Sequence, residues 1–177
     1  MVDISVACIT GVGIGCINGS VPIKLKDCAI TLDVRVNEGI GIGSLHDIQN
    51  TDVSNFKIIF SGSGSRVACV GTIEPSGGKI TFNSGSIEGL MSGQKIYLIG
   101  APKGEMDILF KNVRTNIKGE GNAVLAIGTV DKKSRISIDE STEEIIINSA
   151  EPTVFGAQDE DVFISERAME PVLRVNE

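Results

Sequence analysis

Lys24-Leu25-Lys26-Asp27-Cys28-Ala29-Ile30-Thr31-Leu32-Asp33-Val34-Arg35-Val36 is the stretch of this 177-residue chain that decides its fold class. The second half places Ile30, Leu32, Val34 and Val36 on one face and Thr31, Asp33 and Arg35 on the other. A side-chain period of two residues is the period of a β-strand. Similar short alternating runs recur towards the C-terminus, so the sequence predicts a protein built from β-strands.

Turn-forming residues separate these runs and suggest how the strands are connected. The predicted turns are Asn18-Gly19, Asn37-Glu38-Gly39, Pro75-Ser76-Gly77-Gly78, Ala101-Pro102-Lys103-Gly104 and Lys118-Gly119-Glu120-Gly121. Glycine reaches positive φ, and proline presets the entry of a turn. Short strands spaced by such turns are typical of a sandwich or barrel, here of about 8–10 mostly antiparallel strands. Helical periodicity is weak throughout, which argues against a βαβ architecture.

Two segments share a pattern in which glycine alternates with a branched apolar residue. They are Gly11-Val12-Gly13-Ile14-Gly15-Cys16 and Gly39-Ile40-Gly41-Ile42-Gly43-Ser44, which lie 28 positions apart. In an extended strand the glycine edge lets another backbone approach closely. Because the flanking residues do not repeat, a chance match and a duplication both remain open, and the pattern does not establish a solenoid.

Composition and charge limit the function classes. Apolar residues make up 41% of the chain, enough for an ordered core, while aromatic residues make up only 4%. From Ser134 onward there are eleven acidic and three basic residues, whereas the first 133 residues are nearly neutral. We therefore expect no binding to nucleic acid or to anionic membranes. The acidic segment is either a solvated surface or an arm that meets a basic patch on a neighbouring subunit.

The sequence predicts two parts, a β-domain over residues 1–149 and an acidic C-terminal arm over residues 150–177. The arm contains short apolar patches set in acidic, proline-interrupted sequence. Such a segment cannot form its own core, but it can donate strand residues to a neighbour. The alternative is that it lies on its own domain. The candidate interaction residues are Val154, Phe155, Val162, Phe163, Ile164, Val172 and Leu173.

The cysteines and the N-terminal segment indicate a cellular compartment. Cys8, Cys16, Cys28 and Cys69 show no CxxC spacing, and we expect reduced thiols that are mostly buried. The first residues lack the features of a signal peptide, and no apolar run is long enough to cross a membrane. We expect synthesis in the cytoplasm.

Catalytic and ligand-binding motifs are weak. The glycine-rich run Gly11–Gly19 has no lysine and fits neither the P-loop nor the dinucleotide fingerprint. His46 is the single histidine, and a surface position is the simplest interpretation. Asp139-Glu140, Glu143-Glu144 and Asp159-Glu160-Asp161 lack the aromatic neighbours of a glycosidase site and the spacing of a calcium loop. We expect no catalytic residues, cofactor or metal.

These observations favour a non-enzymatic structural protein that self-associates or docks onto a larger assembly. Strand donation or edge pairing between subunits is the expected mechanism. By analogy at the level of class, the assembly would be a virion, with the chain as a capsid decoration or tail-tube-like subunit. The alternative from another class is a ligand-binding or adhesive β-module of the glycan-binding type.

Overall fold

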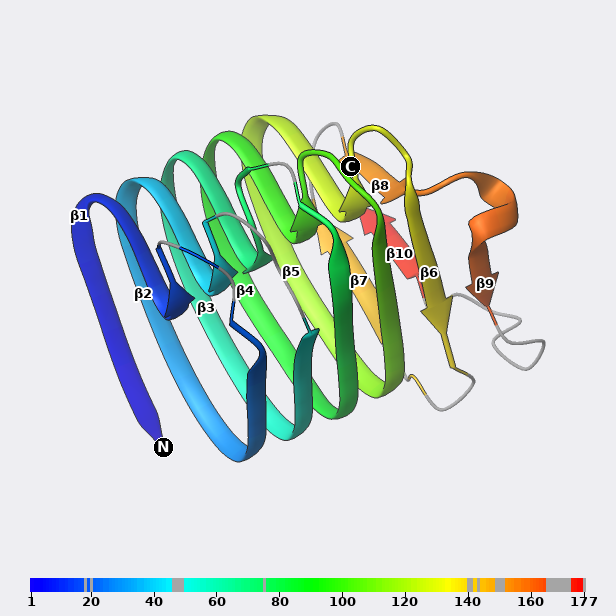
Figure 1. The fold of residues 1–177 in the computed structure, drawn as a ribbon, viewed down its shortest axis with the longest axis horizontal. Coiled ribbons are helices and arrows are strands. Elements are labelled where there is room, and N and C mark those ends of the chain that lie inside the picture. The colour runs from blue at the N-terminus through cyan, green and yellow to red at the C-terminus, as the bar shows by residue number, and fades with distance from the viewer. Residues whose placement is uncertain are drawn as a thin grey trace.

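The chain forms a parallel β-solenoid, in which one long sheet coils around an apolar core (Figure 1). The computed structural model describes residues 1–17, 19, 21–45, 50–74, 76–139, 142, 144–148, 152–164 and 173–176. The strands stack in the order β1-β2-β3-β4-β5-β6-β9, and every strand pair is parallel. β1 forms one end of the stack and the C-terminal strands form the other.

Five long strands are followed by five short ones. Their bounds are β1 (Val2–Cys16), β2 (Ile23–Ser44), β3 (Asn50–Gly71), β4 (Gly78–Ala101), β5 (Met106–Thr129), β6 (Ser134–Ile138), β7 (Glu144–Asn148), β8 (Pro152–Gly156), β9 (Val162–Ile164) and β10 (Leu173–Asn176), with a short 3₁₀ turn η1 (Asp159–Asp161) between β8 and β9. Each of β1 to β5 is one coil of the solenoid. The sixth coil consists of β6, β7 and β8, which all lie on β5, and the seventh consists of β9 and β10.

Residues that pair between neighbouring coils are separated by a nearly constant number of positions in the sequence. Val2 pairs with Ile30, and Ile30 pairs with Ile58, so the register advances by 28 residues at each step. One extra residue enters before β4, where Asn50 pairs with Lys79. The glycine-rich segments obey the same register, because Gly11 pairs with Gly39 and Gly15 with Gly43. The pattern repeated 28 positions apart is therefore a structural repeat, not a chance match.

The predicted antiparallel sandwich or barrel is wrong, because the all-β chain is a solenoid of parallel strands. The error came from interpreting every turn-like stretch as a hairpin. Asn37-Glu38-Gly39 lies inside β2, and Lys118-Gly119-Glu120-Gly121 lies inside β5. In a solenoid a bend leaves the chain hydrogen-bonded to the same neighbouring coils, so a corner does not end the strand or reverse its direction.

The core is a set of apolar columns that run through the coils. The alternation seen in Ile30, Leu32, Val34 and Val36 is confirmed, since all four are buried. One column through the first leg of each coil is Leu25, Val53, Phe82, Phe110 and Ile138. Phe82 and Phe110 stack with ring centroids 5.2 Å apart. Phe56 packs on Phe82 with ring centroids 5.8 Å apart, and together with Phe60 these rings place four of the six phenylalanines in the buried core.

A ladder of glycines forms one corner of the solenoid. Its members are Gly15, Gly43, Gly71, Gly100, Gly128 and Gly156. The first five have positive φ between 109° and 151°. A Cβ placed on Gly15, Gly43, Gly71 or Gly100 would collide with the carbonyl oxygen of the next glycine in the ladder. Only glycine allows the coils to approach this closely at this corner.

A second corner is made by polar residues with positive φ, namely Asp27, Asn55, Ser84 and Asn112. Asn55 Nδ2 donates to Asp27 Oδ1 at 2.6 Å, and Asn112 Nδ2 donates to Ser84 Oγ at 3.2 Å. Short polar side chains tolerate this backbone region. Hydrogen bonds between successive coils therefore link the corner along the solenoid axis.

The strands of the segment that we expected to be a separate arm belong to the same sheet. β8 pairs with β5, β9 with β6, and β10 with β7. The boundary expected between residues 149 and 150 lies outside the described residues. The backbone of β8, β9 and β10 thus continues the solenoid.

Candidate functional site

The seven candidate interaction residues are distributed over the C-terminal strands. Phe155 and Val162 are partly buried and pack against the core, whereas Phe163 is 53% exposed. Val172 lies outside the described residues, and the rest lie in strands, with Val154 in β8, Ile164 in β9 and Leu173 in β10. Among the candidate side chains that the structure describes, which are those of Phe155, Val162 and Phe163, only Phe163 is exposed and available to a partner.

The four cysteines differ in burial, and the expectation that most are buried is wrong. Cys69 is buried, Cys16 and Cys28 are partly buried, and Cys8 is exposed; none of the four is joined in a disulfide bond. Burial raises the pKa of the Cys69 thiol to about 12. Burial, and then the charge of Asp27, raise the pKa of Cys28. A raised pKa disfavours the reactive thiolate, so neither residue suits nucleophilic chemistry.

The other candidate chemical groups do not form a centre in the described part of the chain. His46, Glu140 and Glu143 lie outside it, Glu144 lies in β7, and the Asp159–Asp161 segment forms η1. No group of three or more His, Cys, Asp or Glu side chains among the described residues could hold a metal ion. No helix in the same residues is long and apolar enough to cross a membrane.

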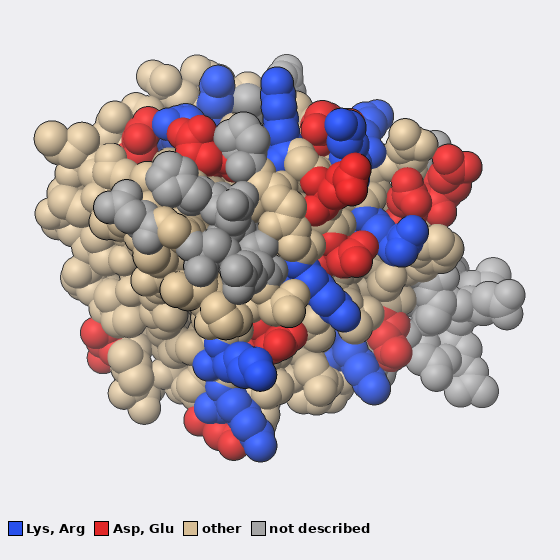
Figure 2. All heavy atoms as spheres, in the orientation of Figure 1, with Lys and Arg blue, Asp and Glu red and all other residues tan. Residues whose placement is uncertain are grey.

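The outer edge of β1 is the most extensive unpaired feature. β1 pairs with β2 on one side, and no strand among the described residues pairs with its other side. Five of the nine exposed large hydrophobic side chains in the described residues lie in β1 or in the residues that flank it: Met1, Val2, Ile9, Ile17 and Val21. Figure 2 shows few charged side chains on this left-hand end of the molecule. An unpaired, weakly charged strand edge is a template for pairing with another chain.

The opposite end of the solenoid is stepped. β9 and β10 of the seventh coil cover β6 and β7, but no described strand covers β8. At the first end, β1 begins in register with Ile30 and leaves the outer edge of β2 before that point uncovered. Both ends of the sheet therefore present backbone edges at more than one level.

An open groove of about 620 Å³ lies across β3, β4, β5, β6 and η1. Its basic lining residues are Lys79, Lys132, Lys133 and Arg135, and its acidic ones are Glu105, Asp107 and Asp161. Lys79, Asp107 and Arg135 share one register, so opposite charges alternate along the groove floor. No aromatic residue is among its lining residues. The groove can hold a polar ligand, but it offers no stacking surface.

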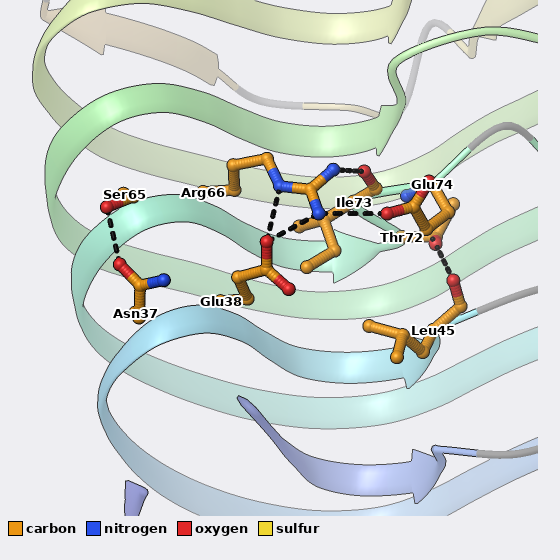
Figure 3. Close-up of polar contacts among 8 residues, drawn as sticks. All are labelled: Asn37, Glu38, Leu45, Ser65, Arg66, Thr72, Ile73 and Glu74. Atoms are coloured by element: carbon orange, nitrogen blue, oxygen red, sulfur yellow. Dashed lines mark hydrogen bonds and ion pairs between the residues drawn. The ribbon is translucent and has the colours of Figure 1, made fainter. Parts of the chain in front are cut away.

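Arg66 forms a polar clamp that holds the segment after β3 against the solenoid (Figure 3). Arg66 Nη2 lies 2.5 Å from Glu38 Oε1 and 2.9 Å from Glu74 Oε1, and Nη1 donates to the Ile73 carbonyl at 3.2 Å. Ile73 belongs to a small buried cluster with Ala68 and Tyr97. Nε also donates to Glu38 Oε1, so each nitrogen of the guanidinium contacts a structural partner and the clamp is a feature of the fold.

Sequence reasoning missed the edge of β1 as a candidate site. The glycine pattern in Gly11–Cys16 did signal close backbone approach, and β2 lies there on one side. The unpaired second side becomes visible only when the 28-residue register assigns each strand to a coil.

Neither the profiles of known protein families, nor the curated proteins, nor the solved structures yield a match to this chain. The class of this chain rests on its fold, which is that of a parallel β-solenoid protein.

Proposed function

We propose that this chain is a non-enzymatic structural protein that self-associates through the ends of its solenoid. The observation that carries this proposal is the 15-residue edge of β1, which is unpaired among the described residues and lies in the coil richest in exposed apolar side chains. Pairing another strand with a long unpaired edge needs little free energy for ordering the backbone, because the N–H and C=O groups of the edge are already arranged for pairing.

Natural sheets usually protect such an edge with lysine, proline or a bulge. β1 contains neither lysine nor proline, and its single charged residue is Asp3. The partly exposed row that continues the core columns includes Val2, Ile4 and Val6. A strand that covers this row would extend the apolar core by one more layer.

A virion component, either a capsid decoration or a tail-tube-like subunit, is one assembly of this kind. That setting stays a prediction, supported by the weakness of catalytic motifs in the sequence. Docking onto other structural subunits through the same edge is the related possibility within this proposal.

The test is the native mass of the full chain, measured by light scattering over a wide range of concentrations. We expect the mass to rise above the 18.7 kDa of one chain as the concentration increases. The variant Val2→Lys should suppress this rise, because a buried ammonium in the new core layer is costly. Leu90→Lys is the matched control, since both Val2 and Leu90 are 51% exposed and Leu90 lies in the middle of the stack, in β4.

A mass that stays at one chain at every concentration would contradict self-association. Equal effects of the two lysine variants would place the contact elsewhere than β1.

The groove favours a second candidate function, binding of an anionic glycan. Four basic and three acidic side chains line it, which leaves a small excess of positive charge in an open polar groove. Calorimetric titration with oligogalacturonate should show binding that the double variant Lys79→Ala/Arg135→Ala weakens, while the exposed Lys57→Ala control leaves it unchanged. Absence of binding, or equal binding of neutral maltooligosaccharides, would reject this candidate.

A further inference from the structure

The two ends of the solenoid have complementary steps, and one strand, β10, occupies a position that contact between these ends requires. The register assigns each C-terminal strand to a position that recurs at the N-terminal end. β8, Pro152–Gly156, has the register of Gly11–Gly15, and β9, Val162–Ile164, has the register of Ile23–Leu25. β7 contains Ile145–Asn148 in the register of Val2–Ser5.

If the first coil of a second copy continued the stack, three contacts would form in register. Its β1 would lie on β8 through Gly11–Gly15 and on β7 through Val2–Ser5, and its β2 would lie on β9 through Ile23–Leu25. The outer edges of β8 and β9 are unpaired among the described residues. The outer edge of β7 is not, because β10, Leu173–Asn176, pairs with Ile145–Asn148.

We propose that β10 is an internal cap, which occupies on β7 the place that Val2–Ser5 of a second copy takes when two copies stack head to tail. This inference rests on the proposed self-association and names its surface, its partner and its control. With β10 in place, a second copy would sit one layer too high and leave β8 and β9 uncovered. With β10 displaced, all three contacts can form at the same time.

The glycine ladder supports a second copy as the occupant of the β1 edge. Along the chain, the missing Cβ of Gly15, Gly43, Gly71 and Gly100 in turn faces the carbonyl of the following glycine. A strand that precedes β1 and continues the ladder in the same conformation therefore needs a glycine against Gly15. The β8 strand of a second copy has Gly156 in the register of Gly15, and a glycine presents no Cβ to this contact; a Cβ on Gly156 would face Thr129 of its own chain.

Charge is compatible with the same pairing. The end formed by β1 has few charged side chains (Figure 2), so it does not repel the acidic C-terminal part of a second copy. Because the contact joins two different ends of the molecule, it does not close on itself and leads to open-ended growth.

Removal of β10 tests the proposal directly. In a chain lacking Leu173–Glu177, light scattering should show association at a concentration about tenfold lower than in the full chain, because the competent end is no longer covered. Val175→Pro in the full chain should act in the same direction, since proline removes a backbone donor from β10 without shortening the chain. Circular dichroism would verify that both variants remain folded.

In the truncated chain, Val2→Lys should restore the one-chain mass and the matched control Leu90→Lys should not. The proposal is overturned if truncation and Val175→Pro leave the association concentration unchanged or raise it. If the full chain associates normally in that case, self-association stands and uses another surface. If neither the full nor the truncated chain associates, the proposed function fails together with this inference.

Discussion

The glycines of the ladder are constrained both by their backbone conformation and by close contact with the next coil. Gly71 has φ of 140°, and a Cβ at this position would collide with the carbonyl of Gly100 in the next coil. Two penalties therefore combine at such a site, an unfavourable backbone conformation and a backbone clash. Gly19 has φ of 100°, but a Cβ there would meet nothing within 4 Å, so only the first penalty applies.

Gly71→Ala should lower the free energy of unfolding by about 3 kcal/mol or more, because strain and overpacking add. Gly19→Ala should cost about 1 kcal/mol from backbone strain alone. Urea denaturation of both variants would measure the difference. Equal losses would show that coil spacing at this corner does not depend on glycine.

The buried thiol of Cys69 links stability to pH. Its pKa is about 12 in the folded chain against 9.0 for an ordinary thiol, because burial penalises the thiolate. The folded state holds the Cys69 thiol proton more tightly than the unfolded state does. The stability that results is complete below about pH 9 and is lost as the pH rises towards 12.

Over this range the free energy of unfolding should fall by up to about 1.4 kcal/mol per pH unit. Cys69→Ala should flatten the dependence of the free energy of unfolding on pH. Part of the slope should persist in Cys69→Ala, because burial also raises the pKa of Tyr97. Chemical denaturation at a series of pH values would check both expectations; an unchanged slope in Cys69→Ala contradicts them.

At the scale of elements, the alternation of side chains was predictable and the course of the strands was not. The period of two in Ile30–Val36 correctly placed one row inside, because burial selects apolar residues on one face. The same pattern does not distinguish a parallel from an antiparallel neighbour. Ser61–Ser65 alternates serine with glycine, a composition typical of a loop, yet it lies within β3 and continues to pair with β4.

The repeat itself was only partly visible in the sequence. Where coils one and two have Gly11 and Gly39, the later coils have Val67, Ile96 and Val124 at the same register. These positions face the core, so each coil fills the available volume differently. Gly41, for example, has no side chain because the ring of Phe60 occupies that space. The core residues at equivalent positions thus differ in size from coil to coil. These differences conceal in the sequence a register that backbone pairing preserves.

The Arg66 clamp stabilises one such element, the segment that leaves β3. Arg66→Ala removes two ion pairs and the bond to the Ile73 carbonyl, and should lower the free energy of unfolding by about 1–2 kcal/mol. Hydrogen exchange should quicken at Thr72–Glu74. Arg35→Ala, which breaks a more exposed pair with Asp33, should cost less than about 0.5 kcal/mol. A loss of equal size in both variants would show that the clamp contributes nothing beyond a surface ion pair.

At the scale of the whole molecule, the sequence-based expectation of self-association and the structure point to different segments. The sequence predicted that the apolar patches after residue 150 form either an arm donated to a neighbour or a segment that lies on its own domain, and the structure pairs β8, β9 and β10 with their own sheet. No local pattern could indicate this, because pairing between coils joins residues 26 to 30 positions apart. The ends of the stack follow only from the complete register.

Head-to-tail stacking also fixes the distance along the solenoid axis between successive copies. The register of Val2 passes through Ile30, Ile58, Ile87, Thr115 and Ile145 before the position that β10 now occupies. A second copy whose Val2 takes that position is displaced by six strand spacings, or about 29 Å at about 4.8 Å each.

The helical rise of assemblies formed by the chain lacking Leu173–Glu177, measured by electron cryomicroscopy, tests head-to-tail stacking most directly. We expect an open filament whose subunits repeat every six spacings of about 4.8 Å along the solenoid axis, which is about 29 Å. A closed ring, a two-fold dimer or a clearly different rise would contradict head-to-tail stacking.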